Sequence, residues 1–279
     1  MEANNEILII GRPGAGKSGF LGQLYGRLMD RSGKLRLKET PSEIQGIKTV
    51  FDRYGLGLEP ETTPANENLE ISIPVLRGEE EILLRCKDYG GEQVRDLTKL
   101  LEYDKTWIDR AKQNDRWVLF IRPSTIGKRF DLSMKGHAEV DDDDTENHQL
   151  GEVTSDQSHF IELLQVLLHA RGIGIKEQVR TPRLMIVLTC WDELESPASP
   201  VDELKSKTPL FYHFLKSNWS ADHLKVMGLS AQGLSLKPKE NQEKYLDELP
   251  ENFGYLVLEE NPKEQEPDLT LLIEEVLCL

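Results

Sequence analysis

Short runs of apolar residues recur along this chain, and amphipathic stretches fill the intervals between them. Four runs predict buried strands, at 6–10, 116–123, 183–189 and 223–230. Apolar side chains three or four positions apart predict helices, at 19–29, 41–54, 158–170, 202–219 and 268–277. Strands that alternate with helices indicate an α/β fold with a mostly parallel central sheet and helices on both faces.

Two further patterns refine the predicted sheet. Residues 69–76 alternate apolar and polar side chains, Gly78 marks a turn, and 81–87 return as a second strand, so this hairpin adds one antiparallel strand. Residues 254–258 fit either an edge strand or a docked loop. Asp268 is predicted to cap the closing helix.

We expect residues 1–279 to form a single domain that carries two inserted segments. The first insertion, 30–68, combines a turn, a helix and a polar loop. The second, 125–156, has almost no apolar residues and holds an acidic cluster, Glu139–Glu146. We interpret it as a solvated acidic loop.

The charge balance narrows the range of partners. The chain has 34 basic and 49 acidic residues, a net charge of −15, whereas nucleic acids and anionic membranes require basic patches. The three cysteines are widely spaced without a zinc-ligand pattern, which fits a reducing, cytoplasmic location. The sequence shows no bilayer-spanning run, signal peptide or prenylation motif, so we expect no membrane anchor.

The residues between the first strand and the first helix fit the phosphate-binding P-loop pattern G-x-x-x-x-G-K-[ST]. They are Gly11, Arg12, Pro13, Gly14, Ala15, Gly16, Lys17 and Ser18. The glycines let backbone N–H groups turn towards phosphate oxygens, and the helix N-terminus adds partial positive charge. We expect Lys17 to reach the β- and γ-phosphates and Ser18 to hold Mg²⁺. The fold is therefore predicted to be a P-loop NTPase.

A D-x-x-G pattern, Asp88–Gly91, follows the second strand of the hairpin. Asp88 could hold Mg²⁺ through a water molecule, and the N–H of Gly91 could meet the γ-phosphate at close range. The alternative is an ordinary turn at the end of a strand. A threonine before the hairpin could complete the metal site; Thr63 is favoured over Thr62 because it lies nearer the strand, and a plain polar loop is the alternative.

Two segments that follow the later strands point to guanine. Asp192 could accept hydrogen bonds from N1–H and the exocyclic amine of guanine, a donor pair that adenine lacks. Its alternative role is to cap a following helix. Backbone N–H groups in the next segment could meet guanine O6. The candidate guanine contacts are Thr189, Cys190, Asp192, Ser230, Ala231 and Gln232.

Taken in order, GRPGAGKS, DYGG, TCWD and LSAQ resemble the motifs of Ras-like small GTPases of the translation-factor-related class. The inserted segments and residues 254–258 also resemble the bacterial double-GTPase families, predicted partners of conflict (defence) systems. The resemblance implies GTP and GDP as ligands and Mg²⁺ as cofactor. It makes 30–68 an enlarged switch I region and Asp88–Gly91 the start of switch II.

Three departures from the family pattern affect the expected activity. Cys190 replaces the usual lysine whose stem packs on guanine, which implies a lower nucleotide affinity. Glu92 stands where many small GTPases have a water-positioning glutamine, and Gln93 comes one residue later. Pro13 removes one loop N–H and fixes φ. We therefore expect slow hydrolysis, in which Lys17, Glu92 and Gln93 are the candidate catalytic residues and a partner supplies an arginine.

The leading hypothesis is a guanine-nucleotide switch. GTP and Mg²⁺ would order residues 59–68 and 88–95 and so control the binding of a protein effector or activating partner. One alternative is a pseudo-GTPase module that holds nucleotide without turnover, which Pro13, Cys190 and Glu92 motivate. Another is a P-loop kinase, although the acidic segment 125–156 is poorly suited to form an arginine-rich lid.

Overall fold

The computed structural model describes residues 6–30, 33–41, 45–60, 69–88, 109, 111–127, 155–174, 177–195 and 197–279. For 69–71 and 86–88 it describes the backbone alone. The strands in these ranges are β1 (Glu6–Gly11), β2 (Leu35–Leu37), β3 (Leu69–Arg77), β4 (Glu80–Asp88), β5 (Arg116–Ile121), β6 (Arg183–Thr189), β7 (Leu224–Ser230) and β8 (Tyr255–Val257). The α-helices are α1 (Lys17–Asp30), α2 (Gln45–Gly55), α5 (Asp156–Ala170), α6 (Pro200–Lys207), α7 (Pro209–Asn218), α8 (Lys239–Asp247) and α9 (Thr270–Cys278).

The strands form one sheet in the order β2-β3-β4-β1-β5-β6-β7-β8. The five strands from β4 to β7 in that order run parallel, as the alternating pattern predicts. β3 pairs antiparallel with β4, which confirms the predicted hairpin. Residues 255–257 form an edge strand, β8, rather than a docked loop. It pairs antiparallel with β7, so the sheet has a second antiparallel strand besides β3. The sheet and its helices confirm the predicted α/β fold class of a P-loop NTPase.

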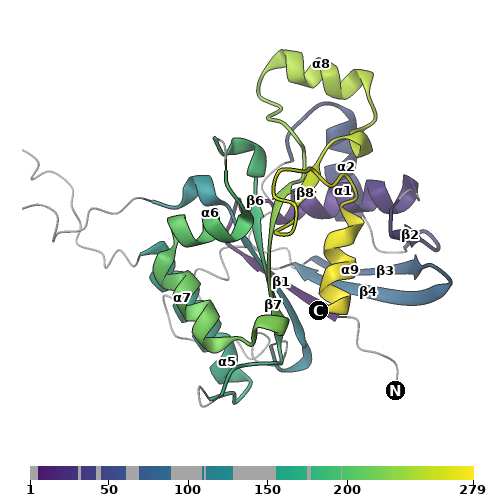
Figure 1. Cartoon of the computed structure of the whole chain (residues 1–279). Helices are drawn as coiled ribbons and strands as arrows, with labels where there is room; N and C mark the ends of the chain where they lie inside the picture. The colour runs from purple at the N-terminus through teal and green to yellow at the C-terminus, as the bar shows by residue number, and fades with distance from the viewer. Residues whose placement is uncertain are drawn as a thin grey trace, which may run out of the picture.

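Helices cover both faces of the sheet, and the side chains of β1 show why. Ile7 and Ile9 pack into one apolar cluster with α1 and α9, whereas Leu8 and Ile10 pack into a second cluster with α5, α6 and α7. Successive side chains of a strand point to opposite faces, so a strand that is apolar at every position needs cover on both. Figure 1 shows the two helical layers on either side of the sheet.

Three elements differ from the sequence-based expectation. The helix predicted at 202–219 is two helices, because Pro209 lacks an N–H and begins a new helix after Thr208 leaves helical geometry (φ −138°, ψ 62°). β2 is a strand of three residues, too short to show a period. α8 was not predicted, because it lies in a polar stretch, and Tyr245 is its only buried residue, so it has almost no apolar periodicity.

The closing helix begins at Thr270 rather than directly after Asp268. Leu269 occupies the N-cap position and offers no side-chain acceptor. The Asp268 carboxylate nevertheless accepts the N–H of Thr270 at 2.9 Å and its hydroxyl at 2.6 Å. The predicted capping contact is therefore made from one residue further out.

The two inserted segments are partly described. Segment 30–68 contains β2 and α2, and 61–68 lie outside the described residues. Segment 125–156 begins at the end of a 3-10 helix, η1 (Pro123–Thr125), and its last residue begins α5. Residues 128–154, with the acidic cluster, lie outside the described part.

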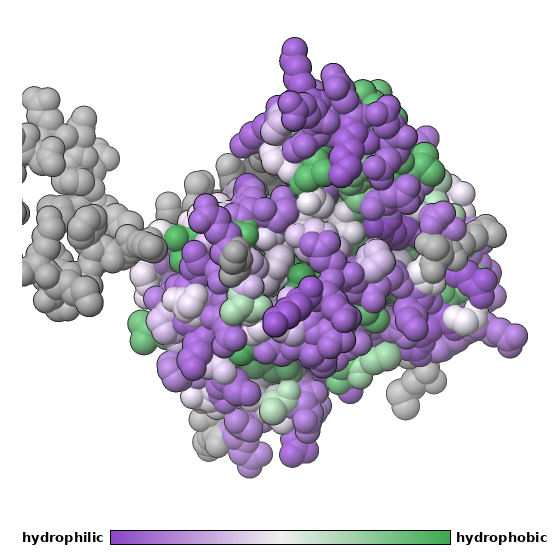
Figure 2. Space-filling view, turned by 45° about the horizontal axis from the view of Figure 1, so that its top comes forward, coloured by the Kyte–Doolittle hydropathy of each residue, from purple (hydrophilic) through white to green (hydrophobic). Residues whose placement is uncertain are grey.

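Polar residues dominate the surface that Figure 2 shows, and hydrophobic residues form only small separate groups on that face. This distribution agrees with the excess of acidic residues in the sequence. Within the ranges that the structure describes, no helix is long and apolar enough to cross a membrane.

Candidate nucleotide-binding site

The predicted phosphate loop connects β1 to the first turn of α1. Gly14 and Gly16 have φ values of +71° and +79°, a left-handed conformation that favours glycine over residues with a β-carbon. The Lys17 ammonium donates to the carbonyls of Gly11 (3.0 Å) and Arg12 (3.3 Å), and the side chain is 7% exposed. The loop thus wraps around its own lysine, which places a positive charge where the motif requires one.

Arg12 fastens this loop to α5. Its guanidinium pairs with Asp156 and lies 5.0 Å from the centre of the Phe160 ring. Asp156 also accepts the N–H of Gly127 at 2.9 Å. Burial raises the pKa of Asp156, but the hydrogen bonds from Arg12 and Gly127 outweigh that effect and lower it. The carboxylate is therefore charged, and Arg12 serves as a structural tie in this arrangement.

The predicted base motif follows β6 and lies against the phosphate loop. A β-carbon placed on Gly16 would lie 3.4 Å from Cβ of Thr189, so the two motifs are in contact distance. The Thr189 hydroxyl donates to the carbonyl of Ile121 at 3.1 Å. Cys190 then takes a left-handed conformation (φ +51°) and starts a 3-10 helix, η2 (Trp191–Glu193). This turn carries Asp192 to the carboxyl edge of the sheet.

Close packing holds the turn in place. Trp191 is 5% exposed, and a β-carbon on Gly228 of β7 would lie 2.7 Å from its ring. Only glycine lets the indole approach the strand so closely. Gly228 therefore fixes where the segment that contains Asp192 leaves the sheet.

The structure brings Asp192 and Ser230 together, as expected for two halves of one base site. The Ser230 hydroxyl donates to Asp192 and accepts the N–H of Gly233 at 2.9 Å. The other possible role of Asp192 was a helix cap, but α6 is capped by Ser199, whose hydroxyl accepts the N–H of Asp202 at 3.1 Å. Asp192 is thus available at the site.

Three tyrosines lie within electrostatic reach of this carboxylate. Burial is the largest cause that raises the pKa of Tyr54, Tyr245 and Tyr255, and nearby groups that include Asp192 add to the rise. The Tyr245 hydroxyl donates to the carbonyl of Gln232. The ring of Tyr245 stacks on Phe253 at 3.8 Å. Sequence reasoning missed a role for these residues, because α2, α8 and β8 contribute them from stretches without a motif.

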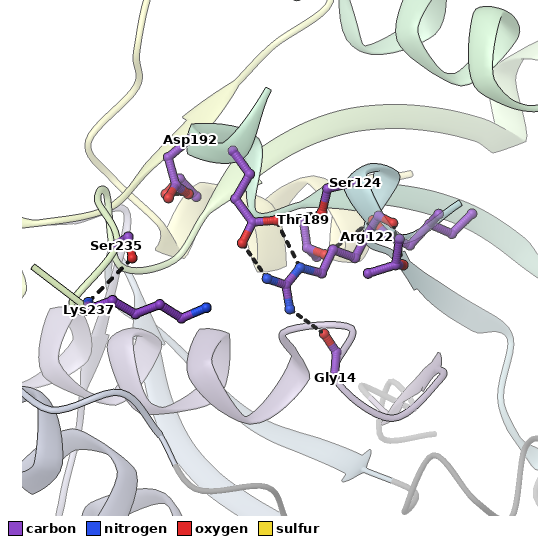
Figure 3. A network of polar contacts seen from close by, with 11 residues as sticks. Gly14, Arg122, Ser124, Thr189, Asp192, Ser235 and Lys237 are labelled. Atoms are coloured by element: carbon purple, nitrogen blue, oxygen red, sulfur yellow. Dashed lines mark hydrogen bonds and ion pairs between the residues drawn. The ribbon is translucent and has the colours of Figure 1, made fainter. Parts of the chain in front are cut away.

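A polar network that no motif indicated connects the two halves of the site (Figure 3). Arg122 follows β5 directly and donates to both carboxylate oxygens of Glu193, from Nε at 2.9 Å and also from Nη2. Its Nη1 donates to the carbonyl of Gly14 at 3.5 Å. The Ser124 hydroxyl donates to Glu193 at 2.5 Å. The position of Arg122 at the end of a buried parallel strand was the signal that could have identified it.

Several predicted site residues cannot be placed in this geometry. Asp88 ends β4 beside Ile9 of β1, at the same edge as the phosphate loop, but only its backbone is described. Ser18 is the second residue of α1 and is half-buried. The remaining predicted residues lie outside the described part of the chain: Thr62, Thr63, Gly91, Glu92 and Gln93.

Solved structures that resemble this chain include the following three. Roco2 RocCORdC of Methanosarcina barkeri bound to GDP is 14% identical (TM-score 0.34), with 87% of this chain and 50% of that chain covered. A probable GTP-binding protein engB is 13% identical (TM-score 0.37), with 87% of this chain and 98% of that chain covered. The bacterial selenocysteine-specific elongation factor EF-Sec is 13% identical (TM-score 0.37), with 86% of this chain and 28% of that chain covered. This chain therefore spans half the length of the Roco2 chain.

No curated protein matches the chain. A family model described as Double-GTPase 1, in contrast, matches residues 8–276, from the third residue of β1 to the last turn of α9. The chain belongs to the Double-GTPase 1 family, which confirms the resemblance that the inserted segments and residues 254–258 indicate.

Proposed function

We propose that this chain is a guanine-nucleotide switch that binds GTP and GDP and slowly hydrolyses GTP, with residues 1–279 acting as a single domain. The observation that carries the proposal is the close approach of the phosphate loop to the base motif, at Gly16 and Thr189. One nucleotide can meet both segments only if they lie at the same edge of the sheet. The family assignment supports guanine as the base.

Each end of the nucleotide would meet a different kind of group. The loop N–H groups and the buried ammonium of Lys17 would bind the phosphates. Asp192 would accept the two guanine donors, and the hydroxyl of Ser230 already holds the orientation of its carboxylate. Backbone N–H groups of Ala231 and Gln232 would meet guanine O6.

The residues present fit a magnesium ion. Ser18 supplies a hydroxyl at the start of α1, and Asp88 ends the strand next to β1. Hydroxyl and carboxylate oxygens are the ligands that Mg²⁺ prefers. Ser18 and Asp88 would hold the ion, with Thr63 as the third proposed ligand, and the ion would neutralise charge on the β- and γ-phosphates.

Control of a partner is the wider part of the proposal. Residues 59–68 and 88–95 would respond to the γ-phosphate and bind an effector or an activating protein. Glu92 and Gln93 would orient the attacking water, and a partner's arginine would raise the rate. A cytoplasmic role in a bacterial conflict system follows from the family resemblance.

Calorimetric titration of the full chain with GDP, GTP and ATP, each with Mg²⁺ and with EDTA, tests this proposal. We expect binding of both guanine nucleotides, at least about tenfold weaker binding of ATP, and weaker GTP binding in EDTA. Equal affinity for ATP and GTP would contradict the assignment of Asp192 and favour a kinase or ATPase. Mg²⁺-independent GTP binding would contradict the metal assignment.

A nucleotide-holding module without turnover is a second candidate, and Pro13 favours it. This residue is exposed at the tip of the phosphate loop, where it offers no N–H to a phosphate. Single-turnover measurement of phosphate release from the GTP complex separates the two functions. Release by the chain alone would exclude the module.

A further inference from the structure

Arg122 joins the two ends of the proposed site without belonging to any of the four motifs. It lies directly after β5, between the strand that leads into the phosphate loop and the strand that leads into the base motif. Its guanidinium reaches the Gly14 carbonyl on one side and the Glu193 carboxylate on the other. Figure 3 shows this bridge between the loop and η2, and Lys237 pointing towards the same space.

The charges along this bridge are well defined. Burial raises the pKa of Glu193, but hydrogen bonds from Arg122 and Ser124, with the positive charges of Arg122 and Lys237, outweigh it and lower the pKa. Glu193 is therefore ionised and pairs with Arg122 through two hydrogen bonds. A paired guanidinium and carboxylate of this kind fix orientation better than a single contact.

The base motif, Thr189–Asp192, contains no lysine or arginine, and Cys190 stands at its second position. Burial raises the pKa of Cys190 to about 11, although the charge of Arg122 acts in the opposite direction. Cys190 is thus a neutral thiol at neutral pH, and it lies within the electrostatic reach of Arg122. The positive charge near Cys190 therefore comes from Arg122, directly after β5, rather than from the motif.

The contact at Gly14 has a direct consequence for the phosphate loop. Gly14 is in the left-handed region, and glycine is free to leave it because it has no β-carbon. A hydrogen bond to its carbonyl limits rotation of the Gly14–Ala15 peptide. Arg122 therefore holds the loop in the shape that presents N–H groups, and through Glu193 it sets the distance to the neighbouring Asp192.

On the basis of the proposed function, we propose that Arg122 is a positioning residue for the bound guanine nucleotide. From the end of β5 it supplies a positive charge within electrostatic reach of Cys190, where the base motif has no cation. Retention of nucleotide then depends on one side chain that holds the phosphate loop and the base-reading turn in register.

The test is the dissociation rate of a fluorescent GDP analogue from the full chain, measured after addition of excess GDP. Arg122→Ala should raise this rate roughly 10- to 100-fold, because both hydrogen-bonded links are lost. Arg122→Lys should raise it less, since one ammonium cannot reproduce the fork. Cys190→Lys in the Arg122→Ala background should restore slow release, because it returns a cation within electrostatic reach of Glu193.

Arg36→Ala is the matched control. Arg36 is an exposed arginine that also donates to a glycine carbonyl, that of Gly78 at 3.3 Å, but it lies in edge strand β2. We expect the Arg36→Ala variant to release the GDP analogue at the wild-type rate. The melting temperature of each nucleotide-free variant identifies a purely structural effect, which Cys190→Lys would not reverse.

The outcomes distinguish this inference from the proposed function. Wild-type chain that does not hold GDP overturns both. Wild-type chain that holds GDP, with Arg122→Ala releasing it at the same rate, overturns only the role of Arg122. The role of Arg122 is also overturned if Arg122→Ala releases GDP faster and melts at a lower temperature, and Cys190→Lys does not slow that release.

Discussion

The phosphate end and the base end of the proposed site are built in different ways. One continuous stretch, Gly11–Ser18, forms the phosphate loop, and backbone conformation with a buried lysine gives it its shape. The base end combines four separate stretches of the chain: Thr189–Glu193, Ser230–Gly233, Arg122 and Tyr245. Side-chain hydrogen bonds hold these pieces together.

This difference separates what each end controls. A local loop that binds phosphates should bind every nucleoside triphosphate, since all of them share the same phosphates. The choice of guanine depends on groups that tertiary packing brings together. Substitutions at the phosphate end should therefore weaken all nucleotides alike, whereas substitutions at the base end should change their ranking.

The largest expected effect is at the phosphate end. Lys17→Met keeps the apolar stem of this buried side chain but removes the ammonium, so binding of GDP, GTP and any weak ATP binding should fall roughly 100-fold together. Calorimetry measures the affinities, and thermal unfolding of the nucleotide-free variant verifies its fold. A selective loss of guanine nucleotides would contradict the proposed division.

The next effect is at the base end. Asp192→Ala removes the acceptor of the two guanine donors and should lower the preference for GTP over ATP by roughly 30-fold, with most of the loss in GTP affinity. Competition of ATP against a fluorescent GDP analogue measures the preference. Retained selectivity would show that another group reads the base.

A pH effect should appear near the phosphate end, where α5 meets Arg12. Burial and then the charge of Arg12 lower the pKa of His159 to about 4, from an ordinary 6.5. Between these values the unfolded chain binds a proton that the folded chain does not, so the free energy of unfolding should fall by roughly 1–2 kcal/mol as pH drops from 6.5 to 4.

Urea unfolding of the nucleotide-free chain at several pH values measures this dependence. His159→Gln should make it shallower, and His169→Gln, an exposed histidine of the same helix, should leave it unchanged. Identical curves for wild type and His159→Gln would contradict the assignment.

The smallest expected effect sharpens the view of the base end. Tyr245→Phe removes the hydroxyl that donates to Gln232, so the base loop should loosen and GDP affinity should fall roughly threefold without any change in ATP affinity. Tyr212→Phe in α7, on the opposite face, is the control. A loss shared by ATP would mean that Tyr245 supports the whole domain.

The sequence by itself determined the main strands, the hairpin and the glycine loop between the first strand and the first helix. These predictions succeeded because apolar runs, glycine spacing and turn residues are local signals. Local signals failed at two places. Pro209 breaks the predicted helix because it has no N–H, and α8 is a nearly all-polar helix whose apolar residues show no period.

Tertiary structure alone decided the rest of the site. Arg122 and Glu193 lie 71 positions apart, and Tyr245 lies 13 residues beyond Gln232, so no spacing rule connects them. Parallel strand order brings their ends to one edge, and only there do a guanidinium, a carboxylate and a glycine carbonyl come within hydrogen-bonding distance. A chain encodes its phosphate loop in neighbouring residues because backbone geometry is local, whereas its base site requires side chains that only the folded sheet brings together.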